Sequence, residues 1–230
     1  MAQAPAAFDV ARIKPYVPEG NAASENSSTN VLPGGRLSAR NVTVRKLIRN
    51  AFGVDDFQIA GAPGWIDSAS YDIEAKTVGG TEITRENIPV LMRWLLENRF
   101  QLQFHRETQE MTEYALEAGK NGAKVKPNTG DSVPSLSTNS RSGIVTLKAT
   151  KISMQDLAGT LRRQLGRAVE DKTGLKGEFD FDMTWSSDLA PEASGASIFT
   201  ALQELGLRLV SIKGPVEIIV IDRVEKASDN

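Results

Sequence analysis

One histidine gives this sequence its clearest capacity for acid–base chemistry. His105 is the only histidine of the chain, and it stands in the stretch FQLQFHRETQE together with Glu107 and Glu110. An imidazole ordinarily titrates near pH 6.5 and, when a carboxylate orients it, can act as general base toward a hydroxyl nucleophile. These residues would suit a small hydrolase. The alternative is structural, namely a half-exposed strand histidine that pairs with a carboxylate.

Strand periodicity limits which of the two glutamates could assist the histidine. Phe100, Leu102 and Phe104 alternate with polar residues, which predicts a strand through this stretch. On a continuing strand Glu107 shares the face of His105, whereas Glu110 points the other way. The sequence therefore leaves catalysis open and favours a protein that is not an enzyme.

Two tryptophans and one aspartate are candidates for binding a partner. In GAPGWIDS, residues 61–68, a rigid loop could present Trp65, with Asp67 beside it, to a protein or a sugar. Trp65 also matches Leu175 in the second half of the chain, which favours packing in the core. Trp94 lies off the apolar stripe of its predicted helix, so we expect it at a contact between modules or with a partner.

The acidic residues do not have the spacing of a known metal site. Asp55, Asp56, Asp72, Asp180 and Asp182 could bind a hard cation such as calcium, but none lies in an EF-hand pattern. With one histidine and no cysteine, a structural zinc site is not expected. A glycosidase with two carboxylates would need more scaffold than modules of this size provide. We expect no metal and no cofactor.

Bulk composition excludes several classes of partner. The 230 residues carry a net charge of −2, which gives no basic footprint for nucleic acid. No apolar run approaches the roughly 20 residues of a transmembrane helix. Without cysteine there are no disulfides and no thiolate chemistry. Ala2, Gln3 and Ala4 look like the small residues around a signal-peptide cleavage site, so we expect a periplasmic or secreted protein whose leader has been removed.

Four amphipathic helices are predicted from apolar residues at helical spacing. The first covers residues 44–52, between a Thr43 N-cap and a Gly53 stop, and the second covers 87–98. The third covers 154–165, with a capping box at Ser153 and Asp156, and the fourth covers 197–205. Strands with a period of two residues are predicted at 71–75 and 179–183. A strand that Pro15 ends is predicted at 8–15, and residues 215–222, which are apolar at most positions, are predicted to form a central strand covered on both faces.

The sequence contains an internal repeat of one unit in two copies. Residues 41–48 match 151–158, 71–73 match 179–181, 97–104 match 204–211, and 113–118 match 217–222. A three-turn amphipathic helix must cover a sheet, so we predict an α+β fold of two small modules, each with two helices on one face of a mixed sheet. The modules are expected at 8–118, with a loop at 16–35, and at 143–226, joined by a linker at 119–142.

Each half resembles the short N-terminal module of secretins and TonB-dependent receptors, the STN domain. The likeness is carried by ATKISMQDLAGTLRRQLG, which resembles its opening strand and helix, and by SIFTALQELGLRLVSIKGPVEIIVID. The second stretch resembles the closing helix, a Gly-Leu-type strand and a terminal hairpin. The resemblance implies tandem βαβ-pair modules, a location in the cell envelope and docking to other proteins.

The whole chain is similar to a soil-associated family of unknown function from Acidobacteria-type genomes. The residues that carry this similarity include FDVARIKP, GAPGWIDSASYDIEAK, LLENRFQLQFHRETQE, EDKTGLKGEFDF and PVEIIVIDRVEK. Members typically carry a signal peptide, and some are joined to sensor proteins of the envelope. The resemblance implies no reaction.

These patterns lead to one expected function and two alternatives. We expect an exported, envelope-associated module that recognises or senses a protein or peptide without catalysis. The alternatives are a small hydrolase that uses His105, and a protein that binds carbohydrate or another small ligand in a groove between the modules.

Overall fold

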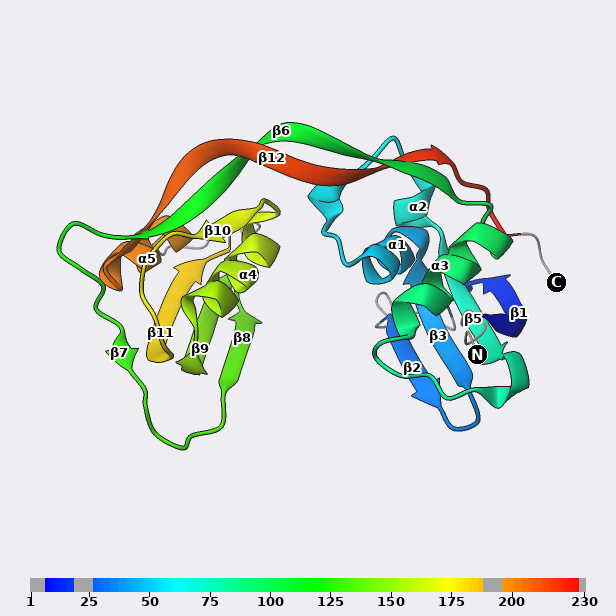
Figure 1. Cartoon of the computed structure of the whole chain (residues 1–230), viewed down its shortest axis with the longest axis horizontal. Coiled ribbons are helices and arrows are strands. Elements are labelled where there is room, and N and C mark those ends of the chain that lie inside the picture. The colour runs from blue at the N-terminus through cyan, green and yellow to red at the C-terminus, as the bar shows by residue number, and fades with distance from the viewer. Residues whose placement is uncertain (1–6, 19–26, 188–195, 228–230) are drawn as a thin grey trace, which may run out of the picture. The chain divides into compact units, whose positions relative to one another are not determined.

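The structure is a computed structural model that describes residues 7–18, 27–187 and 196–227. The expected cleavage-site residues Ala2 to Ala4 lie outside this range. The chain forms two compact units. Unit 1 consists of residues 1–109 and 217–230, and unit 2 of residues 110–216 (Figure 1). Helices and strands are both well represented, so the predicted α+β class is confirmed.

Unit 1 is a four-stranded antiparallel sheet with helices on one face (Figure 1). The strand order is β1-β5-β3-β2. Its elements are β1 (Phe8–Pro15), β2 (Ser28–Leu32), β3 (Arg36–Thr43), α1 (Val44–Phe52), the 3₁₀ turn Asp56–Gln58, β4 (Ile59–Ala60), α2 (Trp65–Ser68), β5 (Ser70–Thr77), the 3₁₀ turn Val78–Gly80 and α3 (Ile88–Arg99).

Helix α1 has the limits that its sequence predicts. The Thr43 hydroxyl accepts a hydrogen bond from the Lys46 N–H, which satisfies one of the free donors of the first turn. The helix ends where Gly53 adopts a left-handed conformation with φ of 64°. Its apolar stripe packs against α3 and the sheet, and Leu47 and Ile48 are fully buried.

Unit 2 repeats this plan with another four-stranded sheet, ordered β7-β11-β9-β8. Helices α4 and α5 share a core with the inward side chains of β9 and β11. The elements are β7 (Lys126–Pro127), β8 (Ser135–Arg141), β9 (Ile144–Ile152), α4 (Met154–Leu165), β10 (Val169–Asp171), β11 (Phe179–Ser186) and α5 (Ile198–Glu204). The capping box of α4 is confirmed, because Ser153 and Asp156 exchange side chain–backbone hydrogen bonds.

A β-bulge before the first helix recurs in both units. In unit 1 the register of β3 on β5 shifts between Ala39 and Val42, and Asn41 has a positive φ of 51°. In unit 2 the register of β9 on β11 shifts at the equivalent place, and Lys151 has a φ of 55°. In each case the N–H of that residue donates to an aspartate on the neighbouring strand.

Two long strands contribute to both units. β6 (Gln103–Ala118) and β12 (Leu207–Arg223) are neighbours in a sheet of order β10-β6-β12-β4. In unit 1 β4 pairs in parallel with residues 219–220 of β12, and in unit 2 β10 pairs in parallel with residues 114–116 of β6. The strand that closes each repeat of the sequence therefore lies in the unit formed by the other repeat.

This exchange places the unit boundaries away from those expected. The sequence predicted modules of 8–118 and 143–226, whereas the compact units divide within β6 and within β12. The reason is that β12 is one continuous strand, where the STN resemblance implied a hairpin. The strand predicted through Phe100, Leu102 and Phe104 also begins later than expected, since Phe100 caps α3 and β6 begins at Gln103.

Both segments expected to be loops contain strands. β2 lies within residues 16–35, and β7 and β8 lie within the expected linker 119–142. Apart from the partly buried Leu136, their side chains are polar or exposed, so the hydrophobic pattern does not predict these strands. Among the residues that the structure describes, no helix is long and apolar enough to cross a membrane.

Candidate functional site

The side chain of His105 pairs with an aspartate on the neighbouring strand. Its Nδ1 lies 2.9 Å from Oδ1 and 3.1 Å from Oδ2 of Asp222. Both side chains are about half exposed, at 54% and 47% of their full surface. This geometry orients the imidazole, as a catalytic carboxylate would. Within the described residues, however, no serine or threonine hydroxyl is hydrogen-bonded to His105, so the structure brings together a base and its orienting group without a nucleophile.

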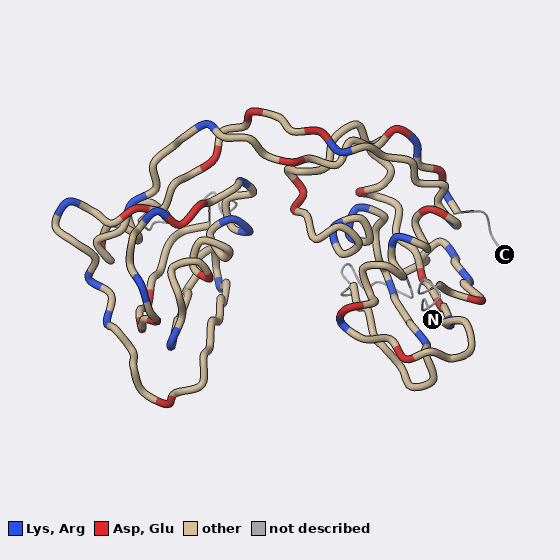
Figure 2. The backbone as a smooth tube through the Cα atoms, in the orientation of Figure 1, with Lys and Arg blue, Asp and Glu red and all other residues tan. Residues whose placement is uncertain are grey.

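Alternating charge along β6 and β12 explains the position of this pair. Arg106 is paired with Glu217 in unit 1, and Arg208 with Glu117 in unit 2. Figure 2 shows acidic and basic residues interspersed along both strands. The histidine–aspartate pair is thus one of several cross-strand pairs of polar side chains on solvated strand faces, and each such pair contributes little to stability.

The two predicted glutamate partners do not contact His105 in the described structure. Glu107 is exposed on β6. Glu110 lies 3.7 Å from Lys213, and both of these side chains are more than 70% exposed. Asp222, which the sequence analysis did not connect with His105, takes their place. Only the register of β6 on β12 brings it there, and no spacing in the sequence predicts that register.

Trp65 and Asp67 lie on the short helix α2 and already have partners within unit 1. The Trp65 ring is half-buried against the core, and the ammonium group of Lys226 lies 5.9 Å from its centre. Arg45 of α1 forms a two-point ion pair with the Asp67 carboxylate. These contacts fix α2 on α1, and a binding role for Trp65 and Asp67 stays a prediction.

Trp94 lies off the buried stripe of α3, as its spacing predicts. It is half-buried, and its ring meets Phe8 of β1 edge to face at 5.9 Å between centroids. Trp94 therefore helps to hold the edge strand β1 against the helix. Its role at an interface stays a prediction.

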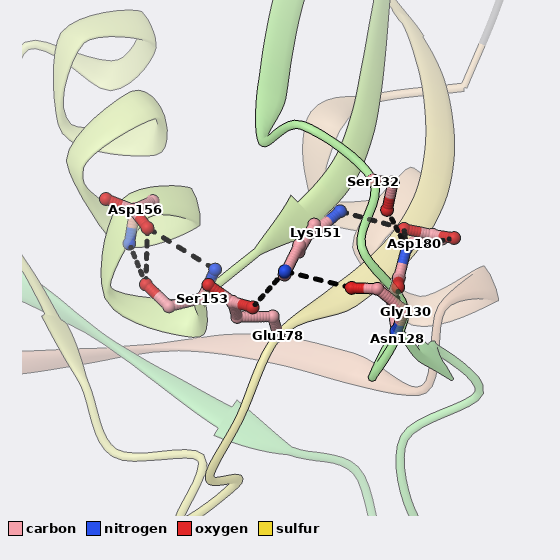
Figure 3. A network of polar contacts seen from close by, with 8 residues as sticks. All are labelled: Asn128, Gly130, Ser132, Lys151, Ser153, Asp156, Glu178 and Asp180. Atoms are coloured by element: carbon pink, nitrogen blue, oxygen red, sulfur yellow. Dashed lines mark hydrogen bonds and ion pairs between the residues drawn. The ribbon is translucent and has the colours of Figure 1, made fainter.

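A polar network of unit 2 is centred on Asp180, which the sequence analysis considered only as a possible cation ligand (Figure 3). Its carboxylate accepts hydrogen bonds from the backbone N–H of Lys151 at 2.8 Å and from Asn128 Nδ2 at 2.8 and 3.0 Å. The Lys151 ammonium group donates to the Gly130 carbonyl at 2.9 Å and lies 3.8 Å from Glu178.

These contacts have an electrostatic and a structural consequence. The hydrogen bond from Asn128, followed by that from the Lys151 backbone, holds the pKa of Asp180 below its ordinary value, because both stabilise the charged form. The same bonds fasten the start of the loop after β7 to the bulge before α4. The network therefore holds β7 beside the start of β11, where β7 pairs with Phe179 and Asp180 only.

Three surface hollows lie away from the predicted site residues. One of about 440 Å³ is lined by the β2–β3 turn and Glu82 in unit 1. One of about 340 Å³ lies at the end of β11 and is lined by Trp185, Ser186 and Phe199, among others. A third, of about 200 Å³, lies beside Lys120 and Arg208. Among the described residues no group of three or more acidic or histidine side chains could hold a metal ion.

Comparison with known proteins gives a family and no activity. The family model described as a protein of unknown function, DUF3738, matches residues 45–224, which is most of the chain. The chain belongs to the DUF3738 family. The expectation of an uncharacterised family is thereby confirmed. No curated protein and no solved structure matches the chain significantly, so the STN likeness and the Acidobacteria association of this DUF3738 protein stay predictions.

Proposed function

We propose that this DUF3738 protein is exported and recognises an extended segment of an envelope protein or peptide, without catalysing a reaction on it. The export and the envelope location rest on the resemblances of the sequence. The mode of recognition rests on the sheets. An extended peptide can add a strand to an open sheet edge, where main-chain hydrogen bonds supply affinity and alternate side chains supply specificity.

Open edges are the observation that carries the proposal. β8 pairs with β9 on one side only, and all but one of its seven residues are exposed. It contains no lysine and no proline, the residues that usually protect such an edge from pairing with other chains. In unit 1 the edge strand β2 likewise exposes Val31 and Leu32. A sheet with such edges is suited to accept a further strand.

The hydrophobic pattern of a ligand follows from this binding mode. Side chains of an added strand alternate between the helix-covered face and the solvated face of the sheet. We expect apolar or β-branched residues at every second position of a bound peptide and polar residues between them.

Selection from a library of short random peptides against the whole protein tests this function. We expect selected peptides to show the alternating pattern and to bind saturably by isothermal titration calorimetry. Each peptide is compared with versions in which proline replaces successive residues. Proline removes a donor and should abolish binding at every second position only. The absence of any binding peptide, or binding that tolerates proline throughout, would contradict the proposed function.

A further inference from the structure

Equivalent strands of the two units have unequal neighbours. In unit 1 β5 lies between β3 and the full-length strand β1, which pairs with it from Phe8 to Pro15. In unit 2 β11 lies between β9 and β7, but β7 pairs only with Phe179 and Asp180. Along the rest of β11, no described strand occupies the position that β1 fills in unit 1.

The registers define which residues are equivalent. Ile73 lies opposite Ala39 in unit 1, and Phe181 lies opposite Ala149 in unit 2. Asp72 and Asp180, which accept the N–H of the bulge residue, lie one residue before Ile73 and Phe181 respectively, so they agree with this equivalence. Asp182 is therefore equivalent to Glu74, and the uncovered part of β11 runs from Phe181 to Trp185.

Alternate residues in this part of β11 direct their backbone N–H and C=O groups to the side away from β9. At one end the Glu178 carbonyl accepts from the Asn128 N–H at 2.8 Å, and at the other the Ser186 N–H donates to the Ala196 carbonyl at 2.9 Å. Every second residue of an antiparallel strand presents its N–H and C=O to the same side. Asp182 and Thr184, which lie between those two, point to that side and have no backbone partner there among the described residues.

Charge and shape indicate what would fit beside β11. In unit 1 Arg12 of β1 lies opposite Glu74, the equivalent of Asp182. Asp182 is exposed, and it forms no ion pair among the described residues. On its covered side Asp182 already lies opposite Lys148 of β9, and a basic residue on the open side would take the position that Arg12 has opposite Glu74 in unit 1.

The far end of the uncovered edge has room for a large side chain. Trp185 is equivalent to Thr77, which lies opposite the buried ring of Phe8 in unit 1. In unit 2 the hollow of about 340 Å³ lies at this end, between Trp185 and Phe199. The buried hydroxyl of Ser186 beside it has no hydrogen-bond partner in the described structure.

We propose that unit 2 binds an extended segment of another polypeptide as a strand antiparallel to β11. The segment carries a basic residue opposite Asp182, apolar residues at the flanking inward positions and an aromatic residue in the hollow beside Trp185. This rests on the proposed function and names the edge and the ligand chemistry. The segment FDVARIKP, which is β1 itself, has this pattern and serves as the probe.

A fluorescent FDVARIKP peptide titrated with the whole protein tests the assignment by anisotropy. We expect saturable binding that Asp182→Lys weakens by about tenfold, since like charges then face each other. A peptide with glutamate in place of its arginine should bind Asp182→Lys better than it binds the wild type. Glu74→Lys is the matched control, because the edge at Glu74 is already covered by β1, and it should leave peptide affinity unchanged. Circular dichroism verifies that both variants are folded.

Backbone methylation of the probe separates strand pairing from side-chain attraction. Two peptides are methylated on alternate backbone nitrogens in opposite phases, and we expect one phase to abolish binding and the other to retain it. Equal binding by both phases would overturn strand addition at β11.

Failure of this inference can be told from failure of the proposed function. If library-selected peptides bind and Asp182→Lys has no effect on them, the edge of β11 is not the site, although peptide recognition stands. If no peptide binds, both fall. Self-association of the protein that Asp182→Lys abolishes, measured by analytical ultracentrifugation, would overturn the assignment of a foreign partner in favour of a second copy.

Discussion

In unit 1 the strand after the bulge has β1 along its whole outer edge, whereas in unit 2 the equivalent strand has only the two residues of β7. The bulge, the aspartate that accepts its N–H and the capped helix that follows it recur in both units. Two sheets with related inner strands therefore differ at one edge, and in our proposal this difference separates a strand that completes a core from an edge that binds a ligand.

Shortening a buried side chain of β1 should have the largest effect on stability among the changes that test this comparison. Ile13 is 1% exposed, and Ile13→Ala should lower the free energy of unfolding by about 2–5 kcal/mol through lost burial and the cavity left behind. Urea unfolding followed by far-UV circular dichroism measures the change.

Two controls show whether the effect depends on covering the core. Val10 on the same strand is 60% exposed, and Lys126 of β7 is exposed. Alanine at either position should change the unfolding free energy by less than about 0.5 kcal/mol. If Lys126→Ala lowered the free energy of unfolding as much as Ile13→Ala does, β7 would stabilise unit 2 as β1 stabilises unit 1.

The polar network that ends the β7 pairing should have a smaller, pH-dependent effect. Hydrogen bonds from Asn128 and Lys151 lower the pKa of Asp180 in the folded protein. Its contribution to stability is therefore fully present above the pKa of the unfolded chain, about 3.9, and is lost as the pH falls through the lower folded-state pKa. The difference in Tm between wild type and Asp180→Asn should be largest above about pH 4 and should shrink in acid.

Differential scanning fluorimetry across this pH range measures the difference. Asp131→Asn removes one charge from an exposed loop residue nearby and serves as the control. The Tm difference between wild type and this control should stay nearly constant. A Tm difference for Asp180→Asn that does not change with pH would show that the carboxylate is not held by these hydrogen bonds.

The parts of this fold that the sequence predicts are those governed by local pattern. In α1 and in α4 the apolar stripe and the capping residues of the helix lie within one short stretch of sequence. Spacing and residue type therefore predict where each of these helices begins and ends. The alternation in β5 and β11 is equally legible, since every second side chain meets the helices.

What the sequence does not predict depends on which distant strands pair. β5 and β11 have the same alternating pattern, yet only one of them is covered by β1. Likewise nothing in the spacing indicates that β12 continues through the expected hairpin turn, that β6 extends to Ala118, or that Asp222 meets His105. Strand register and strand exchange are set by contacts between residues far apart in the chain, so the candidate site could be predicted in its residue types but not in its partners.

The smallest effects should come from the cross-strand ion pairs, and they bear on whether His105 is catalytic. Its pair with Asp222 in unit 1 resembles the pair of Arg208 with Glu117 in unit 2, since each joins a side chain of β6 to one of β12 and all four side chains are at least partly exposed. His105→Ala and Arg208→Ala should each change the unfolding free energy by less than about 1 kcal/mol. Neither should alter the peptide affinity, because the proposed ligand pairs with β11. If the wild type hydrolyses ester, phosphoester or glycoside substrates and His105→Ala stops that turnover while Arg208→Ala does not, the two pairs are not equivalent, and His105 is a catalytic base rather than one ion-pair partner among several.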